Sequence, residues 1–600
     1  MAADVILRGC PHISILATSR ERLGVAGEFV YRLPSLSAEP AADLFIQRAE
    51  AADQQLSFDA AKLPVVTEIA QGLGGIPLAL ELIAAQVPVL GLETLRTHLH
   101  AEFRVASGRR DLPARQQTVI ATIRWSYGLL TADEQALLSD ASIFSGGFAL
   151  GAAEAVCGHG TLQRSQILPL LLSLVNKSLI NVESYANGIR YSLLESVRSF
   201  GLERLQEAGQ YEEVARHHAR WLAAVAEDVE NTTAYLSAER AAELLPDFDN
   251  VRAAIAWSLS AARQEDRVFS VQILTGLLGL WDRVGRRREH RRMIDTALER
   301  IDEEQNPLAA SYLLRDLLMR AQQERSALDI IDRALPLCER SGDQLAMAKL
   351  LLVAAQILAL HCRLETSEAF MERASTSFIA AGLQRSMLFA ALLFSRSQLR
   401  VQQGRIDDAR IDIDGAEKIA LANGDRYYVV CFTYVRRAEI EYAAGNKRLA
   451  LECVERMLQS EFASDGQVAM LALGRIPNLR LQLGDVEGAI QPLCEWLQGM
   501  RGNEGFTHGE LEFAALALAL KRKPIAAARL LGRVRAIEEL APFARSAMRQ
   551  GGYDMLLSSL HQQLDDDAIA AVIAEGARLT GDEAVTEALD GLQHIDEISD

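Results

Sequence analysis

The chain has 600 residues, of which 49% are hydrophobic and 24% charged, and its formal net charge is −18 at pH 7. A chain of this length is too long to fold around a single hydrophobic core, so several domains or a repeat array are expected. The acidic balance repels nucleic-acid phosphates and argues against DNA binding as the role of the whole chain.

The seven cysteines are widely scattered and form no C-x-x-C pair, a pattern typical of reduced, mostly buried thiols in a cytoplasmic protein. The most apolar stretch, 350–360, contains Gln356 and follows a helical period, so it predicts a packed helix and not a membrane span. The first residues lack the basic and apolar regions of a signal peptide. We expect a cytoplasmic protein with no membrane contact.

The first hundred residues combine one strand with several helices. The apolar run 13–17 is rich in β-branched residues and predicts a single buried strand. Helices are predicted over 41–52 and 63–70, and Pro77 suits the first turn of a third, 78–86. Because one strand cannot form a sheet by itself, this segment is expected to be the end of a domain whose beginning is absent.

Residues 116–205 predict three helices and a β-hairpin. A helix over 119–130 is followed by Thr131 and Glu134 at capping-box spacing, and another helix covers 167–175. Strands over 178–184 and 189–193 flank a turn that contains Gly188, and a helix follows through Arg204. This order predicts a winged helix. Its candidate recognition helix, ILPLLLSLV, has no lysine or arginine to donate to base edges, which favours a packing role.

Beyond residue 211 the pattern is helical and repeats with a period near 40. A glycine turn followed five residues later by alanine recurs as Gly404…Ala409, Gly445…Ala450 and Gly484…Ala489. Weaker copies are placed at Gly285, Gln322…Ala327, Leu364…Ala369 and Lys523…Ala528. Paired helices at this period predict an α-solenoid. The basic cluster at 283–292 could bind phosphates or an acidic partner, but a solvated face compensated by neighbouring Glu and Asp is favoured.

Several motifs resemble the bacterial signal-transduction ATPases with numerous domains (STAND), a group of NB-ARC-like nucleotide switches and transcriptional regulators. They are ILATSRERLGVAGE at 15–28, GLGGIPLALEL at 72–82, ATIRWSYGLLTADEQ at 121–135, SLVNKSLI at 173–180 and RYSLLESVRSFGLERL at 190–205. The resemblance implies a mainly α chain in four parts. These are a nucleotide-domain remnant with the sensor strand (1–35), a helical subdomain (36–112), a winged helix (113–210) and a superhelix of tetratricopeptide-like (TPR-like) repeats (211–600).

The resemblance also implies two nucleotide-binding residues, both vestigial here. Arg20 matches the sensor arginine that approaches the γ-phosphate, and Pro77 matches the proline that packs against the adenine ring. Leu194 stands where related switches have a histidine for the β-phosphate. No Gly-Lys dipeptide occurs, so Walker A is absent, and the acidic Walker B strand is absent as well. We therefore expect no ATP hydrolysis, no catalytic residue and no cofactor, with ATP or ADP bound only if the missing nucleotide half is supplied.

Metal binding is not expected either, because the pairs His98/His100 and His217/His218 lack cysteine or carboxylate partners at metal spacing. The leading hypothesis is a non-catalytic regulatory or scaffold protein whose repeats bind a protein or small-molecule signal, with oligomerisation left open. A second is a fragment of an ATP-dependent switch whose Walker motifs lie upstream of the given start. A third, less favoured, is a direct DNA-binding transcription factor.

Overall fold

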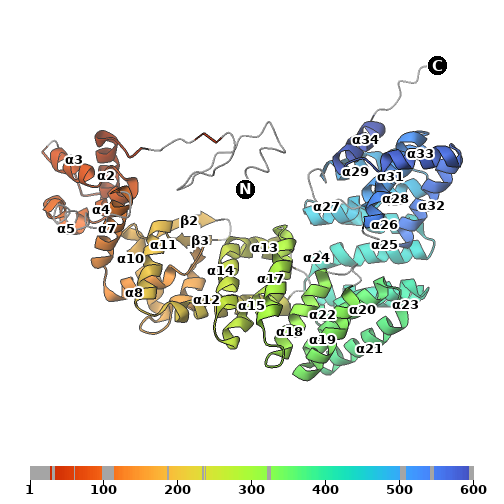
Figure 1. The fold of residues 1–600 in the computed structure, drawn as a ribbon, viewed down its shortest axis with the longest axis horizontal. Helices are drawn as coiled ribbons and strands as arrows, with labels where there is room; N and C mark the ends of the chain where they lie inside the picture. Colours follow the sequence, from red (N-terminus) through yellow and green to blue (C-terminus); the bar gives the residue numbers. More distant parts are fainter. Residues whose placement is uncertain are drawn as a thin grey trace, which may run out of the picture. The chain divides into compact units, whose positions relative to one another are not determined.

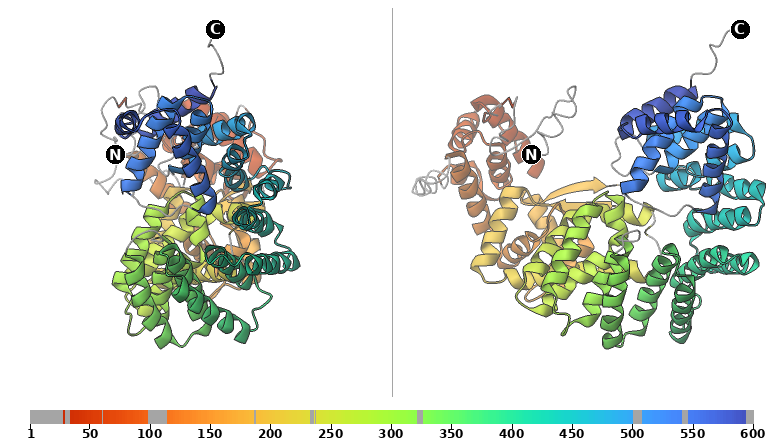
Figure 2. Two further views of the ribbon diagram at one scale, coloured as in Figure 1. Left: turned by 90° about the vertical axis from the view of Figure 1, so that its right-hand side faces the viewer. Right: turned by 45° about the vertical axis from the view of Figure 1, so that its right-hand side comes forward.

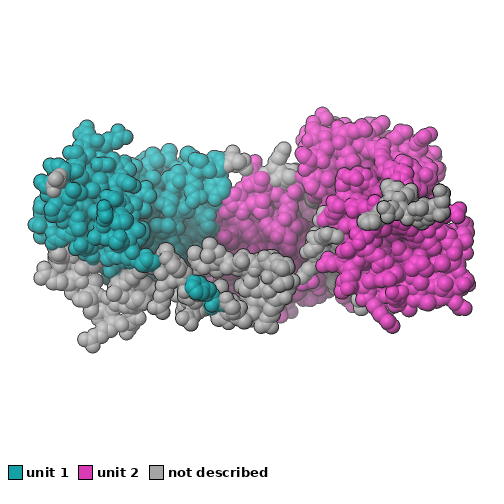
Figure 3. Space-filling model, turned by 90° about the horizontal axis from the view of Figure 1, so that it is seen from above, with its two compact units in different colours: residues 1–217 teal, residues 218–600 magenta. Residues whose placement is uncertain are grey.

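A computed structural model describes residues 28–29, 34–59, 61–97, 114–185, 188–232, 236, 238–320, 326–499, 508–540 and 546–593. The fold is mainly helical with one small antiparallel sheet, as predicted (Figure 1). The chain divides into two compact units, 1–217 and 218–600, which Figure 3 colours separately. The predicted strand 13–17 and Arg20 lie outside the described residues.

The first helices form a small cluster around Phe45, Leu73, Leu80 and Ile83, all buried. Their bounds are α2 (Ala38–Ala52), α3 (Leu63–Gly72), α4 (Pro77–Ala84) and α5 (Val87–Leu90). The chain leaves α3 through Gly75 at φ +61°, where an added Cβ would lie 2.2 Å from the carbonyl oxygen of Leu36. Only glycine fits this turn. It tolerates the left-handed conformation, and its lack of a Cβ leaves room for the backbone at Leu36.

A second part of unit 1 contains the sheet. Its elements are α7 (Ala114–Gly128), α8 (Ala132–Ala141), β1 (Phe148–Ala149), α9 (Leu150–Cys157), α10 (Arg164–Asn176), β2 (Asn181–Tyr185), β3 (Gly188–Ser192) and α11 (Glu195–Glu207). The sheet order is β1-β3-β2, entirely antiparallel, with Tyr191 of β3 paired to both Phe148 and Val182. The predicted capping box is present: the Thr131 amide donates to Glu134 Oε2 at 2.8 Å, and the Glu134 amide donates to Thr131 Oγ1 at 3.3 Å.

Two elements of this part were not predicted from the sequence. The helix α9 is only eight residues long and consists mostly of small side chains, so it gives little apolar periodicity. The strand β1 has two residues and depends on pairing with β3, which is more than 40 residues away in the sequence. The periodicity of neighbouring residues in the sequence does not predict such a distant pairing.

The boundary between the two units falls within helix α12 (Tyr211–Thr232). The described elements that follow α12 are all helical. The first of these are α13 (Ala238–Leu244), the 3₁₀ turn η1 (Leu245–Asp247), α14 (Phe248–Ser260), α15 (Gln264–Gly276), α16 (Leu278–Arg283), α17 (Arg287–Arg300), α18 (Pro307–Arg320), α19 (Ala327–Ser341), α20 (Gln344–Leu360) and α21 (Leu364–Ala380).

The later elements are α22 (Met387–Gln402), α23 (Ile406–Ala422), α24 (Arg426–Tyr428), the π-helical turn η2 (Val429–Thr433), α25 (Tyr434–Ala443), α26 (Lys447–Leu458), α27 (Gly466–Leu473), α28 (Ile476–Gln482), α29 (Val486–Gly499), α30 (His508–Leu520), α31 (Pro524–Leu540), α32 (Ala547–His561), α33 (Asp566–Gly576) and α34 (Gly581–Gln593). Paired helices stack along the array (Figure 2). This arrangement confirms the predicted helical-repeat array.

The turns of the three strong repeat copies have the same geometry. Gly404, Gly445 and Gly484 have φ values of +76°, +86° and +84°, and each ends the first helix of a pair. The alanines five residues later, such as Ala409 and Ala450, are fully buried. A left-handed turn residue followed by a small side chain at the helix contact is therefore the repeating unit of the array.

Two of the weaker copies were placed in the wrong register. The left-handed residue of one is Cys362, at φ +59°, and the buried small residue five positions later is Ser367. The predicted Ala369 is exposed. In the other copy the left-handed residue is Arg522, at φ +58°, rather than Lys523. Neither turn contains glycine, so the sequence does not mark its position.

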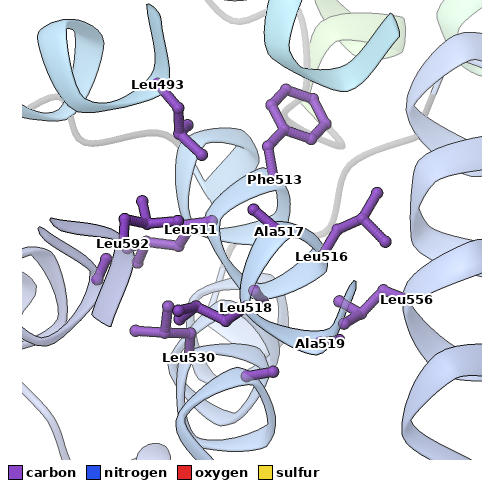
Figure 4. Close-up of a cluster of buried hydrophobic side chains, with 14 of the residues drawn as sticks. Leu493, Leu511, Phe513, Leu516, Ala517, Leu518, Ala519, Leu530, Leu556 and Leu592 are labelled. Carbon is purple, nitrogen blue, oxygen red and sulfur yellow. The ribbon is translucent and has the colours of Figure 1, made fainter. Parts of the chain in front are cut away.

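The C-terminal helices surround α30, which is buried on every side. Its apolar side chains point in several directions and contact neighbouring helices, as Figure 4 shows for Leu511, Leu516 and Leu518. A helix that is apolar all round belongs at the centre of a bundle. The helices α28, α29, α31, α32 and α34 pack against it. The core at this end holds in place the aromatic side chain of Phe513, which lines the site described below.

Candidate ligand-binding site in the helical repeats

Of the two residues that the family resemblance singles out, only Pro77 is among the described residues. Pro77 is the first residue of α4, and its side chain is exposed. Proline suits this position because the first-turn amide of a helix has no partner within the helix. Its predicted contact with an adenine ring, like the predicted role of Arg20, stays a prediction.

The helix α10 presents apolar side chains both inward and outward. Ile167, Leu171 and Leu174 are buried, whereas Leu168 and Leu172 are 39% and 49% exposed. An exposed face made of leucine offers no hydrogen-bond donor to a base edge. The geometry therefore supports the packing role that the sequence favoured for this helix.

The basic cluster at 283–292 is largely compensated by carboxylates and backbone oxygens. Arg287 donates to Asp282 at 2.9 Å, Arg286 donates to Glu289 at 2.9 Å, and Arg291 lies 3.7 Å from Asp295. This agrees with the solvated, compensated face that the sequence favoured.

The histidine pairs give no metal site in the described part of the chain. His98 and His100 lie outside it. The ring of His217 contacts that of His159, with centroids 4.2 Å apart, while His218 is buried and its ring is stacked on Trp221 at 6.1 Å. Burial lowers the pKa of His218 to about 4. Among the described residues, no group of three or more His, Cys, Asp and Glu side chains could hold a metal ion.

A pocket of about 650 Å³ lies within unit 2, between helices that are far apart in the sequence. One wall comes from α16 and the start of α17, and the other comes from α25, α27, α28, α29, α30 and α32. The curvature of the array therefore brings an early repeat against later ones.

Six charged side chains belong to the lining of the pocket. Its arginines are Arg283, Arg287, Arg475 and Arg549, and its carboxylates are Asp282 and Glu439.

Backbone and carboxylate oxygens fix the positions of these arginines. Arg475 donates to the Leu471 carbonyl oxygen at 3.1 Å and to Glu439 at 3.5 Å. Arg283 donates to the carbonyl oxygen of Leu236 at 3.0 and 3.2 Å. Fixed guanidinium groups are prepared for binding, because little side-chain entropy remains to be lost.

Part of the pocket lining is apolar. Its apolar side chains are Met470, Leu471, Trp496, Phe513 and Met548. The rings of Trp496 and Phe513 are stacked with centroids 6.2 Å apart. Their helices α29 and α30 belong to the C-terminal core, so these aromatic surfaces are held rigidly.

A buried hydrogen bond joins two helices of the second wall. Asn478 on α28 is 1% exposed, and its Nδ2 donates to the carbonyl oxygen of Met548 on α32 at 2.9 Å. Removing one partner of a buried hydrogen bond lowers stability by more than the bond's net contribution, because the other partner is left unsatisfied. Asn478 therefore fixes the spacing of the two helices at the pocket.

Only part of this pocket could be recognised from the sequence. The sequence marked the basic cluster that contains Arg283 and Arg287, but Arg475 and Arg549 stand isolated in the sequence. More than 150 residues separate the first two from Glu439 and the residues beyond it on the opposite wall. These residues come together because the repeat array curves, and the repeat period in the sequence does not predict that curvature.

No family model matches the chain. Over 485 residues the chain is 30% identical to proteins named "Putative HTH-type transcriptional regulator" in Mycobacterium tuberculosis and Mycobacterium bovis. The match covers 78% of this chain and 53% of theirs, so the chain spans about half the length of these curated relatives. It is also 37% identical over 222 residues to an "Uncharacterized protein" of Mycobacterium tuberculosis, a match that covers 36% of this chain and 56% of that protein.

Among solved structures, the chain is similar to a STAND protein with a tetratricopeptide repeat sensor from Pyrococcus horikoshii. The TM-score is 0.50 at 14% identity, and the match covers 94% of this chain and 75% of that chain. At this identity the likeness concerns the fold. The resemblance found in the sequence is thus confirmed: the chain is a relative of the mycobacterial proteins named as HTH-type transcriptional regulators, and it has the fold of a STAND protein with a tetratricopeptide-repeat sensor.

Proposed function

We propose that this chain is a non-catalytic part of a transcriptional regulator, in which the helical repeats bind a protein or small-molecule signal. The observation that carries this proposal is the pocket of about 650 Å³, which is lined by four arginines and by apolar side chains. Pockets of this volume, apolar inside and with a few fixed polar groups, are typical of ligand sites. The names of the mycobacterial relatives agree with a regulatory role.

We also infer that 113–210 is a winged helix. The order α8, β1, α9, α10, β2, β3, with β3 between β1 and β2, is the topology of that module. The apolar outer face of α10 supports a role in packing against another protein surface rather than in reading DNA. We expect no salt-dependent binding of duplex DNA by the purified chain, and such binding would favour the direct transcription factor instead.

The helix α12 is suited to carry a signal from the repeats. It begins in unit 1 and continues into unit 2, where Glu230 accepts from Arg315 at 2.8 Å and from Lys349 at 3.1 Å. Burial raises the pKa of Glu230, but the charges of Arg315 and Lys349 outweigh it and bring the pKa to about 2. The ion pairs therefore fix the end of α12 to helices α18 and α20, so that a shift of those helices would act on α12 directly.

Catalysis is not part of this proposal. The sequence contains no G-x-x-x-x-G-K-[ST] motif, and without it the triphosphate and magnesium lack their principal ligands. The purified chain is expected to release no phosphate from ATP beyond a no-protein control. Hydrolysis, or nucleotide binding at micromolar concentration, would instead favour the ATP-dependent switch.

The regulatory proposal is tested by transcript profiling, which requires no knowledge of the ligand. In the organism that encodes the chain, deletion of the gene is expected to change a defined set of transcripts. Complementation with the wild-type gene is expected to restore that set. If the deletion leaves the profile unchanged under growth conditions in which the gene is expressed, the proposal is wrong.

A further inference from the structure

We propose that the pocket between α16–α17 and α27–α32 binds a small amphipathic anion, a molecule that joins a carboxylate, sulfonate or phosphate group to an aromatic or other apolar body. This inference rests on the proposed sensing role of the repeats. It adds the chemical class of the signal and the residues that would recognise it.

The lining of the pocket has a formal charge opposite in sign to that of the whole chain. Its lining carries four arginines and two carboxylates, although the chain has a formal net charge of −18. Each of the two carboxylates also pairs with an arginine outside the lining, Asp282 with Arg320 and Glu439 with Arg436. Glu512, which lies 3.5 Å from Arg549, offsets one positive charge. The formal charge of these residues together remains positive and favours an anion.

The geometry of the arginines suits an oxyanion. A guanidinium has five N–H donors in one plane and binds a carboxylate or phosphate through two of them at once. Among the described residues, Arg475 uses one bond to a backbone oxygen and a long one of 3.5 Å to Glu439. Its side chain is 26% exposed, so solvent or a ligand reaches it.

The apolar part of the lining suits an apolar body. Trp496 and Phe513 are part of the lining but are only 8% and 3% exposed, so Met470, at 47%, exposes the most apolar surface there. Methionine adapts to ligands of varied shape, because its side chain is flexible and polarizable. An anion without an apolar part would leave this surface in contact with water, so inorganic phosphate alone is expected to bind weakly.

The position of the site gives binding a structural consequence. A ligand held by Arg283 and by Arg475 would contact helices from both ends of the array, α16 and the α27–α28 connection. Such a ligand would favour the closed arrangement of the two walls over a more open one. Its effect on the array would equal its difference in affinity for the two arrangements.

The test compares an aromatic acid with its neutral amide. Isothermal titration of the purified full chain would use 1-naphthaleneacetate and 1-naphthaleneacetamide as probes. The acid is expected to bind at least about tenfold more tightly than the amide, because hydrogen bonds from a guanidinium to a carboxylate are stronger than those to a neutral amide. Arg475→Gln and Arg549→Gln are each expected to weaken binding of the acid by about tenfold, with the circular dichroism spectrum unchanged.

Arg480→Gln is the matched control. Arg480 lies on the same helix as the pocket residue Asn478, is 27% exposed and pairs with Glu455 at 2.7 Å, but it does not line the pocket. Its substitution is expected to leave the affinity for the acid unchanged. Equal binding of acid and amide, no binding of either, or an affinity unchanged in both pocket variants would each overturn the inference.

A negative result in the titration can be distinguished from a negative result in the transcript test. Absence of acid binding together with a regulatory phenotype would reject the anion site and keep the regulatory function. Acid binding that depends on Arg475, together with an unchanged transcript profile, would keep the site and reject the regulatory function.

Discussion

His290 is a buried histidine held in one protonation state by its two neighbours. Its Nδ1 lies 3.3 Å from an Arg320 nitrogen, which can only donate, so its Nε2 carries the hydrogen and donates to the Leu274 carbonyl oxygen at 3.1 Å. Burial lowers its pKa to about 4, and the Arg320 charge acts in the same direction, while the Leu274 carbonyl and Asp282 oppose the shift. The neutral form is therefore built into the α15–α17 packing.

This site predicts a loss of stability in acid. The unfolded chain protonates His290 near its ordinary pKa of 6.5, while the folded chain does so near 4. Its contribution is thus fully present above pH 6.5 and is lost as the pH falls towards 4, by up to about 3 kcal/mol. His290→Gln, which can donate and accept in the same place, is expected to flatten this part of the pH profile of urea unfolding. A profile as steep as that of the wild type would contradict the assignment.

The left-handed turn residues predict opposite effects of two substitutions. Cys362→Gly removes the strain of a side chain at φ +59°, and Gly404→Ala introduces such strain at φ +76°. Local stability is expected to rise by about 1 kcal/mol in the first variant and to fall by about 1 kcal/mol in the second. Hydrogen exchange of peptides that cover each turn measures both, and a change of the same sign in both variants would refute the argument.

These turns also show how far the repeat could be predicted from the sequence. Where glycine occupies the turn, the register was predicted correctly. Where Cys362 or Arg522 occupies it, tertiary packing imposes a conformation that the residue type disfavours, and the predicted register was shifted. His290 is a further case, since a histidine stands where other repeats have a small residue, five positions after Gly285.

At the scale of the helices, α31 and α33 cross at a contact made by two glycines. An added Cβ at Gly576 would lie 1.9 Å from the carbonyl oxygen of Arg529, and one at Gly532 would lie 2.1 Å from that of Ile573. These are backbone atoms, so relief requires the helices to separate. The sequence predicted helices here but not this contact, because a helical glycine ordinarily indicates only reduced helix propensity.

The crossing predicts that Gly576→Ala destabilises the chain even though alanine favours helix. Separation of α31 from α33 would loosen the C-terminal core, at an expected cost of about 1–3 kcal/mol. Gly581→Ala is the control, since nothing lies within 4 Å of an added Cβ there. Thermal unfolding measures both variants, and a Gly576→Ala chain as stable as the control would show that the contact is looser than described.

At the scale of the whole molecule, the helical-repeat architecture followed from a period visible in the residues, whereas the pocket did not. A repeat constrains neighbouring helices, but the angle between successive repeats accumulates from many small packing choices. Arg283 and Arg549 therefore meet at one pocket through geometry that no local motif encodes.

Among the described residues, no helix has the length and hydrophobicity to cross a membrane.

The most direct test of the account asks whether the pocket is needed for regulation. Met470→Glu places a negative charge on a side chain that is 47% exposed and lines the pocket, and Leu483→Glu does the same at a 43% exposed position outside it. Transcript profiles of the deletion strain complemented with each variant are compared. The account predicts that Met470→Glu fails to restore wild-type control while Leu483→Glu restores it. Full restoration by Met470→Glu would contradict the account.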